Sequence, residues 1–157
     1  MTLEWAAWGA ARSGRAPRSG RSDAEAIEAR LANALAAVEP YPFDIIGPAA
    51  GAGSPMVLDW GPLLRRLLAD LRSGAEKDIL SLRFHATLAA AIAAIVSGAG
   101  AGSVALSGGC FQNRLLLLET VRRLEADNRR VYQHRELPPN DGCIAVGQIA
   151  VASTRLG

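Results

Sequence analysis

The 157-residue sequence is poor in the residues from which several kinds of site are built. It has two cysteines, two histidines, one lysine and 5% aromatic residues. Cys110 and Cys143 do not make a disulfide framework, and neither has another cysteine nearby at zinc-binding spacing. The net charge is only +2, and no arginine block is interleaved with aromatic residues. The composition therefore excludes a disulfide scaffold, and we expect no nucleic-acid partner.

Long apolar runs are also missing. The most apolar window, residues 88–101, is alanine-rich and shorter than a bilayer span, and no signal peptide opens the chain. We therefore expect a soluble cytoplasmic protein with no membrane partner. Half of the residues are apolar, so a chain of this length can bury a core as a single domain.

Helical and strand patterns alternate along the chain, which indicates an α/β domain with helices packed on a sheet. A capping box at Ser22 and Glu25 starts the first of the main helices, and Asp59 is a candidate cap for the second. Residues 1–11 are predicted to form a short helix and residues 12–21 a mobile loop. Helices are predicted over 22–38, between 59 and 74, over 76–96, over 113–127 and from 144 onward. Strands are predicted over 41–46, 56–58, 104–106 and 129–134, the first two placed to pair as a hairpin.

The apolar spacing predicts which side chains of these helices point inward. They are Ile27, Leu31, Ala34 and Leu35; Leu63, Leu64, Leu67, Leu68 and Leu71; Ile79, Leu80, Phe84, Leu88, Ala91, Ile92 and Ile95; and Ile144, Val146, Ile149 and Val151.

The predicted ligand site is built around one glycine-rich turn. Ser107, Gly108 and Gly109 follow a short buried strand, and Asn113 opens a helix. Such a corner aims backbone N–H groups and the positive end of a helix dipole at one point, where an anion such as a phosphate fits. A tight strand-to-helix turn without any ligand explains the same residues, and the motif is neither a Walker loop nor a dinucleotide fingerprint.

A second turn, Asn140 to Cys143, precedes the last helix, and Asp141 within it has two interpretations. It caps that helix, or it is a carboxylate for a metal ion or for a metal-bound phosphate. No His, Cys, Asp or Glu cluster in the sequence supplies the partner ligands. His85 and His134 have no motif around them, and a packing or hydrogen-bonding role is the default for each.

Two motifs together are specific. The first is Leu106-Ser-Gly-Gly-Cys-Phe-Gln-Asn-Arg-Leu-Leu, and the second is Leu137-Pro-Pro-Asn-Asp-Gly-Cys-Ile-Ala-Val-Gly-Gln. Both resemble the C-terminal end of the HypF family, the carbamoyltransferases of NiFe-hydrogenase maturation. Segments near residues 1, 41, 59 and 83 match in the same order, so the resemblance covers essentially the whole chain.

The resemblance implies the second lobe of an actin/sugar-kinase/Hsp70-type (ASKHA) α/β fold, with a mixed sheet and packed helices. It implies a transfer of a carbamoyl group from carbamoyl adenylate to the C-terminal cysteine of the partner HypE. By position, Ser107, Gly108, Gly109 and Asn113 would lie against the nucleotide. Asp141 would be a ligand of a divalent metal ion, of the iron or zinc type, shared with the first lobe.

The sequence departs from the family pattern at several points. Cys110 stands where valine is usual, and Cys143 where a second glycine is usual; a positive φ at Cys143 would strain the turn. The family's histidine pair, four residues apart, is absent, as are the first lobe, the zinc fingers and the YrdC-like domain. We therefore expect a C-terminal portion that is inactive alone and needs the missing N-terminal part. The alternatives are a non-catalytic HypE-docking or nucleotide-binding module, and a relative of the tRNA-modifying transferases of the same fold.

Overall fold

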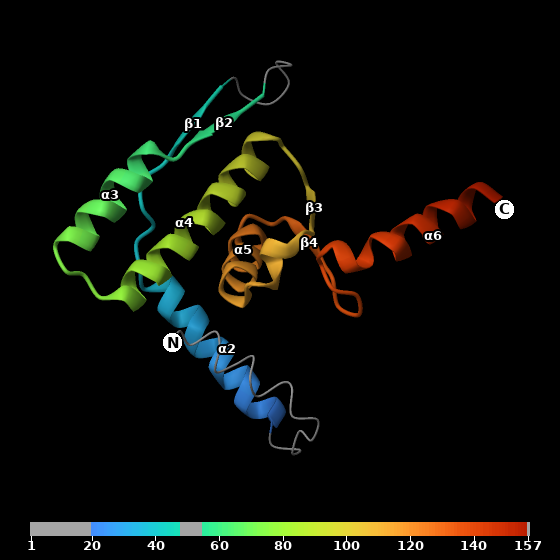
Figure 1. The fold of residues 1–157 in the computed structure, drawn as a ribbon, viewed down its shortest axis with the longest axis horizontal. Coiled ribbons are helices and arrows are strands. Elements are labelled where there is room, and N and C mark those ends of the chain that lie inside the picture. The colour runs from blue at the N-terminus through green and yellow to red at the C-terminus, as the bar shows by residue number, and fades with distance from the viewer. Residues whose placement is uncertain (1–19, 48–54, 157) are drawn as a thin grey trace.

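The computed structural model describes residues 20–47 and 55–156, and these ranges confirm the predicted alternation of helices and strands (Figure 1). The expected helix at 1–11 and residues 12–19 of the expected loop lie outside the described residues. The helices are α2 (Gly20–Ala36), α3 (Gly61–Arg72), α4 (Lys77–Gly98), α5 (Arg114–Ala126) and α6 (Ile144–Leu156), with short 3-10 turns η1 (Gly109–Gln112) and η2 (Asp141–Cys143). The strands are β1 (Asp44–Ile46), β2 (Val57–Asp59), β3 (Ser103–Leu106) and β4 (Arg130–Gln133).

The described strands form two separate two-stranded sheets. Strands β1 and β2 make the predicted antiparallel hairpin, with Asp44 opposite Asp59. Strands β3 and β4 are parallel, and their register places Leu106 opposite Gln133. Helix α5 connects β3 to β4, so this half of the molecule is a βαβ unit whose two strands end at the same edge.

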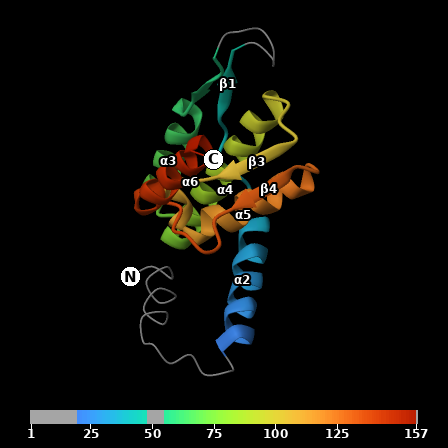
Figure 2. The ribbon, with the colours of Figure 1, turned by 90° about the vertical axis from the view of Figure 1, so that its right-hand side faces the viewer.

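Helix α4 is the centre of the core and packs against α5, α2 and α3 (Figure 1 and Figure 2). Its fully buried residues include Ala86 and Ala89, and α5 contributes the buried Leu116 and Leu124 to the core. With 22 residues, α4 extends well beyond the apolar window at 88–101 and is long and apolar enough, by length and composition alone, to span a membrane. The expectation that the most apolar segment is shorter than a bilayer span is therefore wrong. In the folded protein, 28% of the apolar window of α4 is buried, and α4 contacts three other helices.

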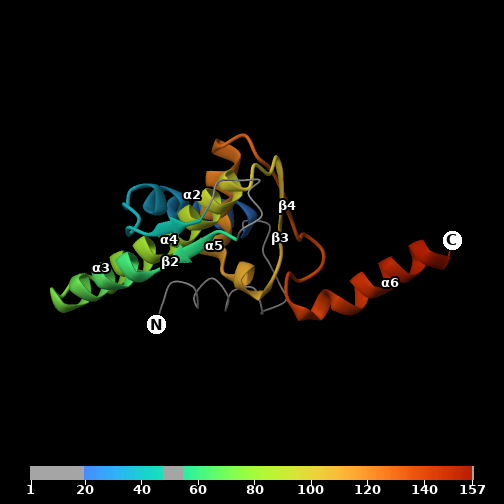
Figure 3. The ribbon, with the colours of Figure 1, turned by 90° about the horizontal axis from the view of Figure 1, so that it is seen from above.

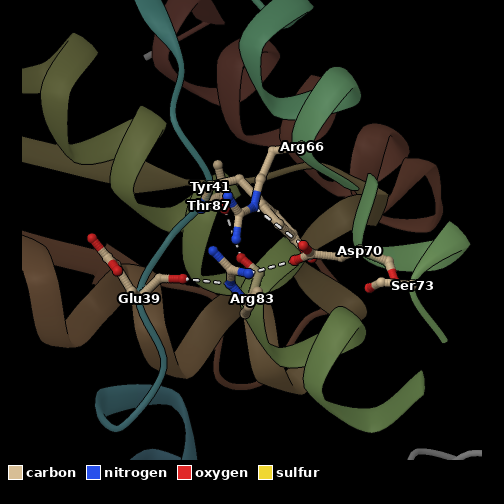
Figure 4. A network of polar contacts seen from close by, with 7 residues as sticks. All are labelled: Glu39, Tyr41, Arg66, Asp70, Ser73, Arg83 and Thr87. Carbon is tan, nitrogen blue, oxygen red and sulfur yellow. Dashed lines mark hydrogen bonds and ion pairs between the residues drawn. The ribbon is translucent and has the colours of Figure 1, made fainter. Parts of the chain in front are cut away.

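A polar network ties the segment after α2 to helices α3 and α4 (Figure 4). The buried Tyr41 donates its backbone N–H to Thr87 Oγ1 at 2.7 Å, and its hydroxyl donates to Asp70 Oδ2 at 3.2 Å. Asp70 also accepts from Arg83 Nη1 at 2.5 Å and pairs with Arg66. The Arg83 guanidinium lies 4.1 Å from the centre of the Tyr41 ring. Burial, together with the neighbouring Asp70, raises the pKa of the Tyr41 hydroxyl.

Two predicted helix starts are wrong in detail. Helix α2 begins at Gly20, so Ser22 lies inside the helix and is not its N-cap. Helix α3 has Trp60 as its N-cap residue, yet the Asp59 carboxylate still accepts the Gly61 amide at 2.8 Å. Both shifts are within the one or two residues by which helix ends vary.

Several helix faces predicted to be buried are exposed. Ile27 on α2 and Ile79 on α4 are 48% and 42% exposed, because the first part of α2 extends beyond the other helices and Ile79 lies in the first turn of α4 (Figure 1). On α3, Leu63 is buried, whereas Leu64, Leu68 and Leu71 are about half exposed.

Helix α6 is the largest departure. Its apolar residues Ile144, Val146, Ile149 and Val151 were predicted to be inside but are 44–69% exposed. Figure 3 shows the reason: α6 points away from the other described elements, at the end of the molecule opposite α3. An amphipathic pattern predicts that a face will be covered and does not say by what.

Helix α5 carries a buried carboxylate that is paired with two arginines of the same helix. Glu119 accepts two hydrogen bonds from Arg122 and one from Arg123, each at 2.7 Å. Burial by itself would raise the pKa of Glu119, but the hydrogen bonds and charges of the two arginines outweigh it and lower that pKa. The ionised form is therefore the one that the folded protein stabilises.

We expect the Thr87→Val change to destabilise the fold by about 1–3 kcal/mol, because it leaves the buried Tyr41 N–H without an acceptor. Urea unfolding followed by circular dichroism measures this. The same change at the exposed Thr154 of α6 is the matched control and should stay within about 0.5 kcal/mol of the parent protein. Equal effects at both positions would show that the Tyr41–Thr87 hydrogen bond is unimportant.

We expect Glu119→Gln to lower the free energy of unfolding at neutral pH by about 1–3 kcal/mol, through loss of the charged hydrogen bonds. Since the pKa of Glu119 is lowered in the folded state, its contribution is present above the ordinary value of 4.5 and is lost as the pH falls through the folded value. Urea unfolding from pH 7 to pH 3 should therefore show the two proteins converging in acid. Glu125→Gln, at an exposed position of the same helix, should follow the parent profile.

Candidate functional site

The two glycine turns meet, as the sequence predicts. The Gly108 amide donates to the carbonyl of Pro139 at 2.6 Å. A Cβ placed on Gly109 would lie 3.9 Å from the Cβ of Asn140. The corner after β3 and the turn before α6 therefore lie against each other, at the edge where the parallel strands end.

Gly108 serves this corner through its backbone conformation. Its φ of +104° and ψ of 154° lie in a region that residues with a side chain rarely adopt. Its N–H donates to the Pro139 carbonyl, so this amide is not among the backbone N–H groups that the corner could offer an anion. The glycine shapes the turn and joins it to the second one.

Asp141 does not cap the last helix. Asn140 is the N-cap of η2, and its Oδ1 accepts the Gly142 amide at 3.0 Å. Asp141 is exposed as the first residue of this turn, so its carboxylate is not used as a cap. Within the described part of the chain, no group of three or more His, Cys, Asp or Glu side chains could hold a metal ion. The residues present therefore do not make a metal site on their own.

Ser107 and His134 lie opposite each other just beyond the paired strands. The β3–β4 register, continued by one residue, places them side by side, and His134 Nε2 lies 3.1 Å from Ser107 Oγ. Both are exposed, so the pair faces solvent next to the glycine corner. A lone histidine at a strand end gave no sequence signal, because the register that pairs it with Ser107 is a tertiary feature.

Asn113 is the N-cap of α5 and also contacts α4. Its Oδ1 accepts the Leu116 amide at 3.1 Å, and its Nδ2 lies 2.7 Å from His85 Nε2. His85 Nδ1 lies 2.7 Å from the carbonyl oxygen of Ser81. Each of the chain's two histidines thus hydrogen-bonds to one of the predicted nucleotide-binding side chains. Sequence reasoning left both aside.

The two cysteines flank the junction without strain. Both are free thiols, Cys110 exposed and Cys143 partly buried. Among the described residues, Asn128 is the only non-glycine with a positive φ, so the backbone strain considered for Cys143 does not occur. Cys143 instead donates its amide to the carbonyl of Asn140 at 3.1 Å.

The chain matches the family model described as "Carbamoyltransferase, Kae1-like Domain, second subdomain" over residues 22–148. Carbamoyltransferase HypF of Synechocystis sp. is 38% identical over 94 residues, which are 60% of this chain and 12% of that protein. Carbamoyltransferase HypF2 of Cupriavidus necator is 42% identical over 102 residues, 62% of this chain and 12% of that protein. The chain therefore spans a small part of these relatives.

A solved structure gives the same match in three dimensions. The crystal structure of full-length HypF in its phosphate- and nucleotide-bound form superposes with a TM-score of 0.65 and 32% identity. The match covers 80% of this chain and 17% of that one. Sequence and fold therefore agree on the same relatives, and the α/β fold predicted from the resemblance is confirmed.

We expect the Gly108→Ala change to destabilise the protein by about 1–3 kcal/mol, because alanine is strained at this φ and ψ. The added Cβ would meet only Cys110 Sγ, at 3.9 Å, so the cost comes from the backbone and not from a clash. Urea unfolding measures it. Gly147→Ala in α6, where nothing lies within 4 Å, should cause no loss, since alanine is the better helix former. A neutral Gly108→Ala would show that the corner does not depend on this conformation.

Proposed function

Since the chain belongs to the family of Kae1-like carbamoyltransferase domains of HypF, as the second subdomain, we propose that it forms one wall of a nucleotide cleft in a carbamoyltransferase. The observation that carries this proposal is the junction of the two glycine turns. It brings Gly108 and Gly109 of the first motif against Pro139 and Asn140 of the second, at one edge of the β3–β4 pair. The carboxyl edge of parallel strands is where α/β folds bind ligands.

The nucleotide proposed for this wall is carbamoyl adenylate. Ser107, Gly108, Gly109 and Asn113 would lie against it, with Ser107 and Asn113 offering polar side chains and the glycines allowing close approach. The crystal structure of the related full-length HypF, in a phosphate- and nucleotide-bound form, supports this choice. The identity of the bound group remains our proposal for this chain.

The proposed reaction transfers the carbamoyl group to a thiol supplied by HypE. The sulfur of the C-terminal cysteine forms a bond to the carbamoyl carbon, the bond from that carbon to the phosphate oxygen breaks, and AMP leaves with the electron pair. The thiol proton goes to solvent or to a base outside this chain. In this scheme, the chain's own residues bind and orient the adenylate, and no nucleophile is needed from them.

Asp141 is proposed as one ligand of a divalent metal ion of the iron or zinc type, shared with the first lobe of a HypF-type transferase domain. The described residues do not complete such a site, so the other ligands would have to come from that lobe. The exposed position of Asp141 beside the junction leaves its carboxylate available to a group on the other lobe.

We propose that the chain works only with the N-terminal part of a HypF-type protein, in the cytoplasm. The exposed apolar faces of α3 and α6 support this, since residues such as Leu68 and Ile149 gain from being covered. The same faces favour the second candidate, a non-catalytic module that docks on HypE. The two candidates differ in whether the glycine-turn junction is needed.

The test is a reconstitution. We expect the chain alone, with ATP, carbamoyl phosphate and HypE, to leave the HypE C-terminal cysteine unmodified. Adding a separately expressed N-terminal remainder of a HypF protein should restore carbamoylation, read as the mass of intact HypE. Asp141→Asn should reduce the restored rate at least tenfold, whereas Asp127→Asn, an exposed change at the end of α5, should not.

Each arm of the reconstitution separates the candidates. Carbamoylation by the chain alone would contradict the proposed dependence on a missing part. No carbamoylation with the remainder, together with a HypE pull-down that survives Asp141→Ala, would favour the docking module. Failure of both would remove HypE as the partner.

A further inference from the structure

We propose that His85 is a positioning residue that fixes the side-chain amide of Asn113 toward the nucleotide. The inference rests on the proposed function, because it assumes that the junction binds a nucleotide. The observation behind it is a chain of hydrogen bonds that runs from the backbone of α4 through two side chains to the start of α5. Its members are the Ser81 carbonyl, His85, Asn113 and the Leu116 amide.

The backbone groups at the two ends of this series of hydrogen bonds determine which side-chain atom is the donor at each step. The Ser81 carbonyl can only accept, so His85 Nδ1, at 2.7 Å, carries the hydrogen. In the neutral ring, Nε2 is then unprotonated and accepts from Asn113 Nδ2, also at 2.7 Å. At the other end, the Leu116 amide can only donate, so the atom facing it must be Asn113 Oδ1, at 3.1 Å.

The opposite orientation of the Asn113 side-chain amide would lose both of its hydrogen bonds. A flipped Asn113 would set its NH2 group against the Leu116 N–H and its oxygen against the lone pair of His85 Nε2. Two donors would then face each other at one end and two acceptors at the other, so the flip loses the helix cap and the link to α4. Both side chains are partly buried, which limits how far water can compensate.

The fixed orientation determines what Asn113 can offer a ligand. One Nδ2 hydrogen is used by His85, and the second is left as the hydrogen-bond donor that Asn113 would offer the ligand in this proposal. It therefore selects an acceptor atom, such as a ribose, phosphate or ring-nitrogen acceptor of the nucleotide. His85 reaches the site only through Asn113, which makes it a positioning residue and not a catalytic one.

The experiment compares three variants of the full 157-residue chain, with ATP as the probe, at a temperature at which each variant is folded. His85→Leu removes the acceptor for Asn113 and should weaken ATP binding about tenfold. His85→Gln keeps an acceptor oxygen near the position of Nε2 and should stay within about threefold of the parent chain. Ser97→Ala, an exposed change near the end of the same helix and outside this series of hydrogen bonds, should bind ATP as the parent chain does.

A second measurement does not depend on any ligand. Nitrogen-15 NMR of the histidine rings should show His85 in the neutral form with the hydrogen on Nδ1. This readout reports the hydrogen-bond direction directly and would not be moved by a general loss of stability. It also keeps the proposal open to refutation if His85→Leu fails to fold.

The outcomes are distinguishable. If the parent chain does not bind ATP, the proposed nucleotide wall fails, and the ligand role of Asn113 with it. If the parent chain binds ATP and His85→Leu binds equally well, only the positioning role of His85 is overturned. A hydrogen on Nε2 in the NMR spectrum would also overturn it, whatever the binding data show.

Discussion

The hydrogen bond from the Gly108 amide to the Pro139 carbonyl is the contact on which the candidate site depends. It joins a turn that follows β3 to a turn that precedes α6, about thirty residues later in the chain. Gly108 makes this hydrogen bond while it adopts a φ of +104°, a conformation that residues with a side chain rarely adopt. Without this contact, the two sequence motifs would be two unrelated loops.

Helices α5, α4 and α3 support this junction through a series of contacts. Helix α5 connects the paired strands, and its start is fixed to α4 through Asn113 and His85. Helix α4 is in turn tied to α3 and to the segment at Tyr41 by the network around Asp70 and Arg83. A displacement of α4 would therefore also move the start of α5, at the edge of the site. The hydrogen bonds that join the two helices are satisfied in only one arrangement.

The exposed surfaces are consistent with a part of a larger molecule. The chain spans 12% of the two HypF relatives compared above, and its helices α3 and α6 present apolar faces that the described residues leave uncovered. The candidate site has the same character. It offers a glycine corner, a serine, an asparagine and one carboxylate, which would make only one wall of the proposed nucleotide cleft.

The sequence by itself determined the order of elements, the hairpin, the helix that starts near Asn113 and the family. These features depend on local spacing or on motifs that are contiguous in the chain. The tertiary structure alone decided which apolar faces are covered, since the spacing of Ile144 to Val151 on α6 cannot say what lies beside the helix. It also decided the hydrogen-bond partners of His85 and His134. Each partner is 27 or 28 residues away, and only the packing of α4 on α5 and the β3–β4 register bring it within hydrogen-bonding distance.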